Sequence, residues 1–179
     1  MADAMDSKSI SREGVGVQVP ASAPRAGSDE LARVLLPALL HRLNNVTQVL
    51  AGVNSLVRVS GSPAALVERA GDLEHAGGAL ERLGWLVGAL ARGMGTGIGA
   101  PREDERALEW LVDLLAESLR REGRELSGPR TLPRADFAQS WELARGLLAA
   151  ACASAPGSVL AWSVRLEGQR LVLLAEERA

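Results

Sequence analysis

Aromatic residues are scarce in this sequence, which has no tyrosine, one phenylalanine and four tryptophans among 179 residues. Proteins that bind single-stranded nucleic acids stack the bases on aromatic side chains, so the scarcity argues against such a surface. The net charge of −2 likewise provides no basic footprint for a phosphate backbone. We therefore expect no nucleic-acid partner and a core made mainly of leucine, valine and alanine.

Cysteine and histidine are also rare. Cys152 is the single cysteine, which excludes an intrachain disulfide and a cysteine cluster for metal. With only His41 and His75 beside it, a zinc site is not expected either. The sequence therefore predicts no metal or cofactor of its own.

Long apolar runs are missing as well. None reaches the roughly 18 residues that a membrane-spanning helix needs, and the N-terminus lacks the apolar core of a signal peptide. The composition, 47% hydrophobic and 23% charged, is ordinary for a globular protein. These features predict a soluble, cytoplasmic protein without a membrane partner.

The first periodic segment begins after residues 1–27, which mix serine, glycine, proline and charge and are expected to be disordered. Ser28 is placed as an N-cap of a helix that runs to about Ser60. Pro37 lies inside it and is expected to bend its axis. At ~100° per residue, one broad apolar arc collects Leu31, Leu35, Ala38, Leu39, Leu43, Val46, Val49, Leu50, Val53, Leu56 and Val57.

Three residues of this helix are candidates for chemistry. His41 and Asn45 lie one turn apart at the edge of the apolar arc, so the imidazole would be anchored on one side and reachable on the other. A neutral, exposed imidazole can act as a nucleophile and carry a covalent group. Arg42 falls inside the arc, which is an unfavourable place for a charge.

A second helix is predicted from Ser62-Pro63 to about Arg92. Leucine or valine recurs in it every seven residues, a pattern typical of a coiled coil or helical bundle. Two long helices joined by a few residues form an antiparallel hairpin. We expect residues 28–92 to dimerise into a four-helix bundle; the alternative is a monomeric helical core. The repeat consists of Leu66, Leu73, Leu80 and Val87.

The rest of the chain changes character. Residues 93–101 are rich in glycine and read as a linker, because no strand precedes them and no lysine follows, as a phosphate-binding loop requires. Residues 102–179 are predicted to form a small α/β lobe. Its first helix runs from Glu103 to Arg121 and is ended by Gly123, and its second begins at Pro133 and Asp136 and lasts to about Ala155. A short strand is possible at residues 124–126, and residues 158–166 and 170–174 are predicted to form a terminal β-hairpin. The predicted fold class is therefore mainly α with a small α/β part.

The segment His41-Arg42-Leu43-Asn44-Asn45, on the first helix of a hairpin, resembles the phosphoacceptor motif of bacterial sensor histidine kinases. In that family the hairpin is the dimerisation and phosphoacceptor domain, and an ATP-binding lobe of helices packed on a sheet follows a linker. The resemblance covers roughly residues 28–179 and implies that His41 is phosphorylated.

The departures from that family are equally informative. The family usually has an acidic residue after the histidine, where this chain has Arg42, and commonly a proline where it has Val46. The family's Mg²⁺-binding asparagine corresponds to Ala150, and the later nucleotide motif and lid would follow the hairpin, beyond Ala179. The resemblance therefore implies no ATP binding and a degenerate lobe, as in the histidine phosphotransferases of bacterial phosphorelays.

The resemblance therefore implies a two-component phosphorelay protein. Neutral His41 would take a phosphoryl group from the aspartate of a response-regulator receiver domain and pass it to another, with Mg²⁺ supplied by the receiver. Asn45 would donate a hydrogen bond to the phosphoryl oxygens or orient water for hydrolysis. Arg42 would offset phosphoryl charge, or else reach past the apolar arc to water.

Two other interpretations stay open. The chain could be a catalytically inactive pseudokinase adaptor that binds a receiver or a kinase through the same helical face. It could also be an unrelated helical protein in which His41 has no chemical role. His75 reads as a surface residue, and Trp110, Trp141 and Trp162 as core residues of the lobe. Trp85 could pack in the bundle or be exposed.

Overall fold

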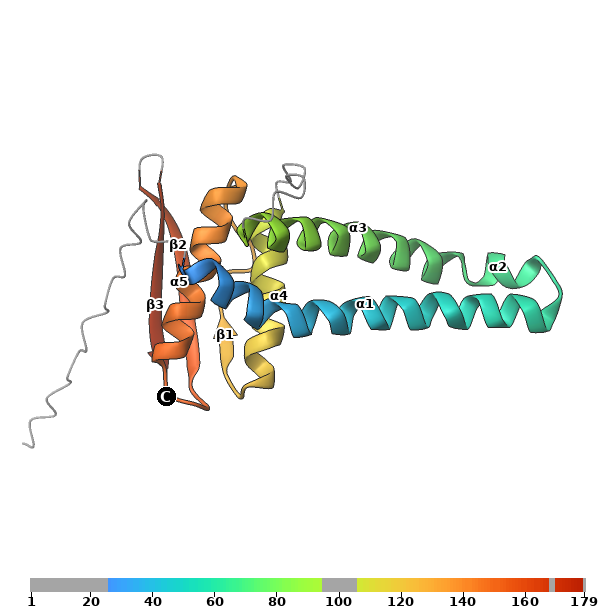
Figure 1. The fold of residues 1–179 in the computed structure, drawn as a ribbon, viewed down its shortest axis with the longest axis horizontal. Helices are drawn as coiled ribbons and strands as arrows, with labels where there is room; N and C mark the ends of the chain where they lie inside the picture. The colour runs from blue at the N-terminus through green and yellow to red at the C-terminus, as the bar shows by residue number, and fades with distance from the viewer. Residues whose placement is uncertain (1–25, 95–105, 168–169, 179) are drawn as a thin grey trace, which may run out of the picture.

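The computed structural model describes residues 26–94, 106–167 and 170–178. A long helical hairpin projects from a small α/β lobe (Figure 1). The hairpin consists of α1 (Ala26–Ser60), α2 (Ala64–Glu68) and α3 (Ala70–Gly93). Within the described residues, no helix has both the length and the apolar character that crossing a membrane requires.

The first helix matches its predicted end and differs at its start. It ends at Ser60 as expected, and it begins at Ala26, two residues before the predicted cap at Ser28. The chain reverses at Gly61, whose φ of +60° is readily adopted only by glycine. Ser62 then accepts a hydrogen bond through its Oγ from the backbone N–H of Ala64 (3.2 Å) and caps the next helical segment.

The predicted second helix is divided in two. Arg69 has φ −108° and ψ 12°, outside the helical range, and separates α2 from α3. Its carbonyl still accepts a hydrogen bond from the N–H of Leu73 (3.1 Å), so the chain keeps its direction through the break. The interruption is local, and the antiparallel hairpin forms as predicted.

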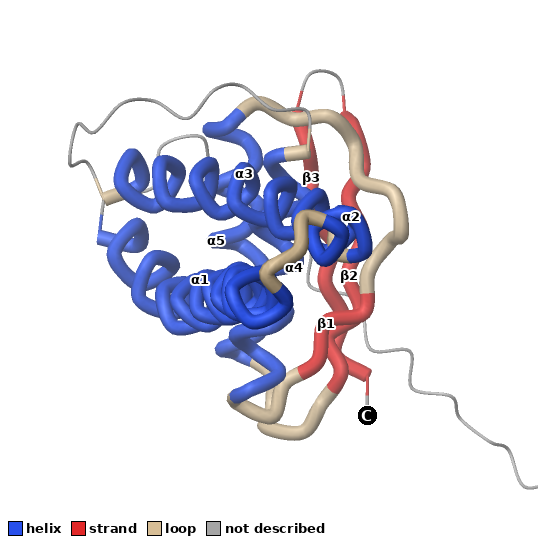
Figure 2. Tube along the Cα trace, turned by 90° about the vertical axis from the view of Figure 1, so that its right-hand side faces the viewer, coloured by secondary structure: helices blue, strands red, loops and turns tan. Residues whose placement is uncertain are grey.

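The lobe contains α4 (Ala107–Arg121), β1 (Glu125–Ser127), α5 (Phe137–Ala153), β2 (Val159–Glu167) and β3 (Arg170–Arg178). The sheet order is β1-β2-β3, with β1 parallel and β3 antiparallel to β2. In Figure 2 the helices lie to one side of this sheet. The prediction of a mainly helical fold with a small α/β part is confirmed.

Local signals set the limits of the lobe helices. Gly123, with φ +74°, follows the end of α4, as its position in the sequence predicted. Asp136 caps α5, since its Oδ1 accepts a hydrogen bond from the N–H of Gln139 (2.8 Å). The predicted start of α4, at Glu103, lies outside the described residues, as does most of the predicted linker.

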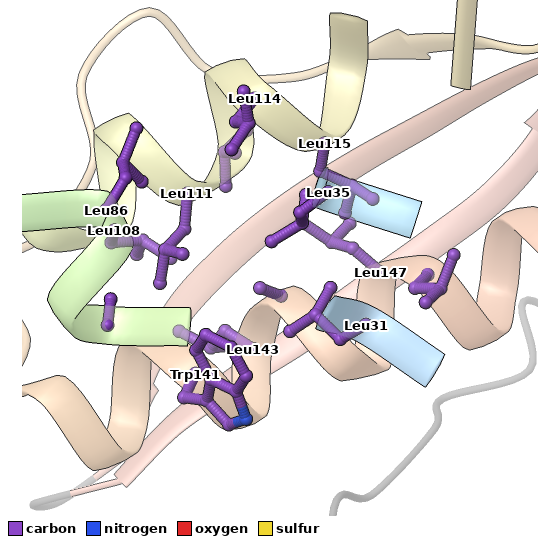
Figure 3. Close-up of a cluster of buried hydrophobic side chains, with 14 of the residues drawn as sticks. Leu31, Leu35, Leu86, Leu108, Leu111, Leu114, Leu115, Trp141, Leu143 and Leu147 are labelled. Carbon is purple, nitrogen blue, oxygen red and sulfur yellow. The ribbon is translucent and has the colours of Figure 1, made fainter. Parts of the chain in front are cut away.

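One hydrophobic core joins the base of the hairpin to the lobe. Leucines from α1, α3, α4 and α5 converge in it (Figure 3). Burying a leucine fully contributes about 2 kcal/mol, so this junction is the principal source of stability in the described residues. Its fully buried leucines are Leu31, Leu35, Leu86, Leu108, Leu111, Leu114, Leu115, Leu119, Leu147 and Leu173.

The tryptophans mark the same junction. Trp141 and Trp162 are buried as predicted, and Trp110 is half-buried against the core. Trp85, whose place the sequence left open, is buried near the lobe end of α3. Its ring meets that of Trp110 edge to face, with centroids 5.3 Å apart, so it fastens the hairpin to the lobe.

Candidate functional site

His41 lies on α1, one turn after Pro37, and its side chain is exposed to solvent. The helix continues through Pro37. On the side of α1 that faces the core, Ala38 and Leu39 are buried. The imidazole is therefore carried on a firmly held stretch of helix and remains accessible, as the sequence predicted.

Asn45 is the hydrogen-bond partner of His41. Its Nδ2 lies 3.2 Å from Nε2 of the imidazole, one helical turn away. An amide nitrogen can only donate, so this contact requires Nε2 to be the unprotonated acceptor and Nδ1 to carry the proton. The lone pair of Nε2 therefore accepts this hydrogen bond, and Nε2 can act as a nucleophile once the Asn45 amide moves off it.

Arg42 points away from this pair and toward the lobe. Its Nε donates to Oε2 of Glu117 on α4 (2.6 Å), and its Nη2 donates to the backbone oxygen of Asp113 (3.3 Å). This explains a charge inside the apolar arc, because α4 covers that side of α1 and provides a carboxylate there. Both sequence interpretations of Arg42, a phosphoryl contact or a path to water, missed this partner.

Acidic residues of α4 form a stripe at the junction with the hairpin. Glu109, Asp113 and Glu117 follow one another at four-residue spacing, which places them on one helix face. Glu117 also accepts from Arg121 on its own helix (Nη2 to Oε1, 3.1 Å). The spacing was visible in the sequence, but its relation to Arg42 depends on how the helices pack.

Two carboxyl groups of the stripe have shifted pKa values in opposite directions. Partial burial raises the pKa of Asp113 above its usual range, and the nearby Arg42 opposes this shift only in part. Hydrogen bonds from Arg106 hold the pKa of Glu109 below its usual range. The negative charge of Glu109 is therefore well compensated by Arg106, whereas that of Asp113 is compensated only in part by Arg42.

Apolar side chains are exposed along the hairpin. Leu36, Leu40 and Leu43 recur at helical spacing on α1, and Leu80 and Val87 recur seven residues apart on α3. We call these five residues the exposed leucine face. The three leucines of α1 lie on one side of that helix, and exposed apolar side chains gathered in this way are typical of an interaction surface.

Ala150, which the resemblance aligned with a Mg²⁺-binding asparagine, lies on α5 and packs against the core. Among the described residues, no group of three or more histidine, cysteine, aspartate or glutamate side chains could hold a metal ion. His75 is exposed on α3, as predicted, and Cys152 is exposed on α5.

Neither the models of known protein families nor the curated proteins include a match to this chain.

Proposed function

We propose that this protein is a histidine phosphotransferase of a two-component phosphorelay, with His41 as the residue that carries the phosphoryl group. The observation that carries the proposal is the exposed imidazole whose Nε2 faces the amide of Asn45 at 3.2 Å. A lone surface histidine would need no such partner. The hydrogen bond selects the tautomer in which Nε2 is the nucleophile.

The proposed reaction balances as a simple displacement. The Asn45 N–H leaves Nε2, and the freed lone pair attacks the phosphorus of an aspartyl phosphate on a receiver domain. A P–N bond forms, and the acyl P–O bond breaks to leave a carboxylate. Nδ1 keeps its proton. Passing the group to a second receiver reverses these bonds, and the receivers supply Mg²⁺, so positioning is the main task of this chain.

Asn45 would act at two stages of this reaction. Before transfer its amide holds the imidazole in the reactive tautomer. After transfer Nε2 no longer has a lone pair, and the same N–H can donate to a phosphoryl oxygen instead. The exposed neighbour Asn44, which points elsewhere on the helix, gives a matched control.

We further propose that the hairpin dimerises into a four-helix bundle through the exposed leucine face. Two helices alone leave these side chains in water, and a second copy would bury them against an identical surface. Sedimentation over a range of concentrations tests this directly, with a dimer expected. A protein that stays monomeric at high concentration would contradict it.

The test of the proposed function is transfer from labelled receivers. The full chain is incubated with phosphorylated receiver domains. We expect acid-labile, alkali-stable label on the wild type and on the control variant His75→Gln, which keeps His41. The variant His41→Gln should acquire none. Because both histidines are exposed on the hairpin, His75→Gln controls for the loss of an imidazole as such.

The same experiment separates the competing functions. If no receiver labels the wild type, but receivers bind wild type and His41→Gln equally, the protein is an inactive adaptor. If neither labelling nor binding occurs with any receiver, the phosphorelay assignment is wrong. Asn45→Ala should slow labelling about tenfold, whereas Asn44→Ala should leave it within about twofold.

A further inference from the structure

The side chain next to His41 forms a joint between the hairpin and the lobe. Arg42 donates from two nitrogens to two residues of α4, the Glu117 carboxylate at 2.6 Å and the Asp113 carbonyl at 3.3 Å. A planar guanidinium held at two points is fixed in direction as well as in place. Glu117 is in turn held by Arg121, so the receiving end of the joint is also ordered.

The joint is partly sheltered from water. The side chains of Arg42 and Glu117 are 35% and 21% exposed, so salt screens their attraction less than that of a fully exposed pair. The joint lies beside the apolar contact between α1 and α4, within the core that unites the hairpin and the lobe. It therefore complements nonpolar packing with a contact that depends on direction.

His41 and Arg42 are consecutive residues on a rigid helix. One residue advances about 1.5 Å along the axis and about 100° around it, so fixing Arg42 against α4 fixes His41 relative to the lobe. A partner domain of about 100 residues has a radius of gyration of about 13 Å. A receiver of this size docked at His41 would therefore contact the lobe as well as the hairpin.

We propose that Arg42 is a positioning residue: its pairing with Glu117 sets the angle at which a docked receiver presents its aspartyl phosphate to His41. This inference rests on the proposed function and assigns Arg42 no contact with the phosphoryl group. To reach a phosphoryl group on Nε2, the guanidinium would have to leave both of its acceptors on α4. The geometry therefore favours the joint over charge neutralisation.

Two phosphodonors of different size separate these roles. Phosphoramidate needs no docking surface: its P–N bond breaks, ammonia leaves, and the phosphorus bonds to Nε2 of His41. A phosphorylated receiver domain must dock. Breaking the joint from the lobe side with Glu117→Arg should leave phosphoramidate labelling within about twofold and lower kcat for the receiver about tenfold, with little change in KM.

Reversal of both charges provides the rescue. Arg42→Glu alone should resemble Glu117→Arg, and the double variant Arg42→Glu/Glu117→Arg should recover transfer to within about threefold of wild type. The matched control is Arg33→Glu, an equal charge change at an exposed residue of the same helix. Partial unfolding would instead lower labelling by both donors in proportion, and the receiver-specific loss would disappear.

Two results would overturn the inference. If Arg42→Glu lowers phosphoramidate labelling as much as receiver transfer, and the double variant gives no rescue, Arg42 acts on the phosphoryl group. If hydrogen exchange in α1 and α4 is unchanged in Glu117→Arg, the joint does not order the two helices. A wild type that no receiver labels would contradict the proposed function, while faster exchange in the single variants and its reversal in the double variant would still establish the joint.

Discussion

The two halves of α1 follow the same apolar period but have opposite surroundings. In the covered half, residues 31–39, the leucines that face inward expose only a few percent of their surface to solvent. In the open half, residues 43–60, half of the eight large apolar side chains are exposed and only Val53 is buried. Buried in the first half are Leu31, Leu35, Ala38 and Leu39; exposed in the second are Leu43, Val49, Leu56 and Val59.

The difference arises from neighbours and not from sequence pattern. The lobe helices α4 and α5 pack on the start of α1, whereas α2 and α3 alone accompany its far end (Figure 1). His41 lies at the boundary between the two halves. It thus lies on a packed stretch of helix and is still exposed to solvent, as the proposed transfer from a receiver domain would require.

Shortening one leucine in each half should give the largest contrast. Leu35→Ala removes a fully buried side chain from the core shared by the hairpin and the lobe. It should lower the free energy of unfolding by about 2–5 kcal/mol. Leu56→Ala, at 39% exposure, should cost less than about 1 kcal/mol. Urea denaturation monitored by circular dichroism measures both. Equal losses would show that the open half is as tightly packed as the covered half.

A charge on the exposed leucine face tests what the open surface is for. Leu40→Glu, at a side chain 55% exposed in the single chain, should leave the helical content unchanged and weaken self-association at least tenfold. The matched control is Gln48→Glu, which adds negative charge at an exposed residue of α1 about 80° around the helix from Leu40. Sedimentation velocity reads out the dimer. A Leu40→Glu protein that associates as the wild type does would exclude this face as the dimer contact.

A glycine at the base of α3 tests how closely the hairpin and lobe approach. A Cβ at Gly93 would overlap the indole ring of Trp141, whereas a Cβ at Gly84 meets nothing within 4 Å. Gly93→Ala should therefore destabilise the protein by about 1–3 kcal/mol. Gly84→Ala should stabilise it by about 0.5–1 kcal/mol, because alanine is the better helix former. Thermal unfolding of the two variants gives opposite shifts, and shifts of the same sign would contradict this packing.

Much of the fold could be predicted from local patterns. The end of α1, the turn at Gly61, the end of α4 at Gly123 and the cap at Asp136 all follow from residue types acting on their own neighbourhood. The break at Arg69 was missed, because the heptad pattern runs through it without interruption. Periodicity predicts which face of a helix is apolar, but it does not predict small deviations of the backbone.

The site divides in the same way. His41 and Asn45 are one turn apart in any helix, so their contact was predictable from spacing alone. The partner of Arg42 was not, since Glu117 is 75 residues away and reaches it only through the packing of α4 on α1. A charge placed inside an apolar arc was a signal that a carboxylate covers that side. The sequence offered several candidates and no means to choose among them.

The smallest effect is expected at the edge of the covered half, in the pH dependence of two carboxylates on α4. Because folding raises the pKa of Asp113, mainly through burial, its charge weakens the fold above that pKa. The penalty disappears as the pH falls through the raised value toward the usual 3.8.

The pKa of Glu109 is lowered chiefly by its hydrogen bond with Arg106, so its charge stabilises the fold above 4.5. This stabilisation is lost as the pH falls through the lowered pKa. Wild type should thus gain stability relative to Asp113→Asn on acidification and lose it relative to Glu109→Gln. Urea midpoints between pH 7 and about 3 measure both trends, and a common direction would show that folding does not shift the pKa values of these two carboxyl groups in opposite directions.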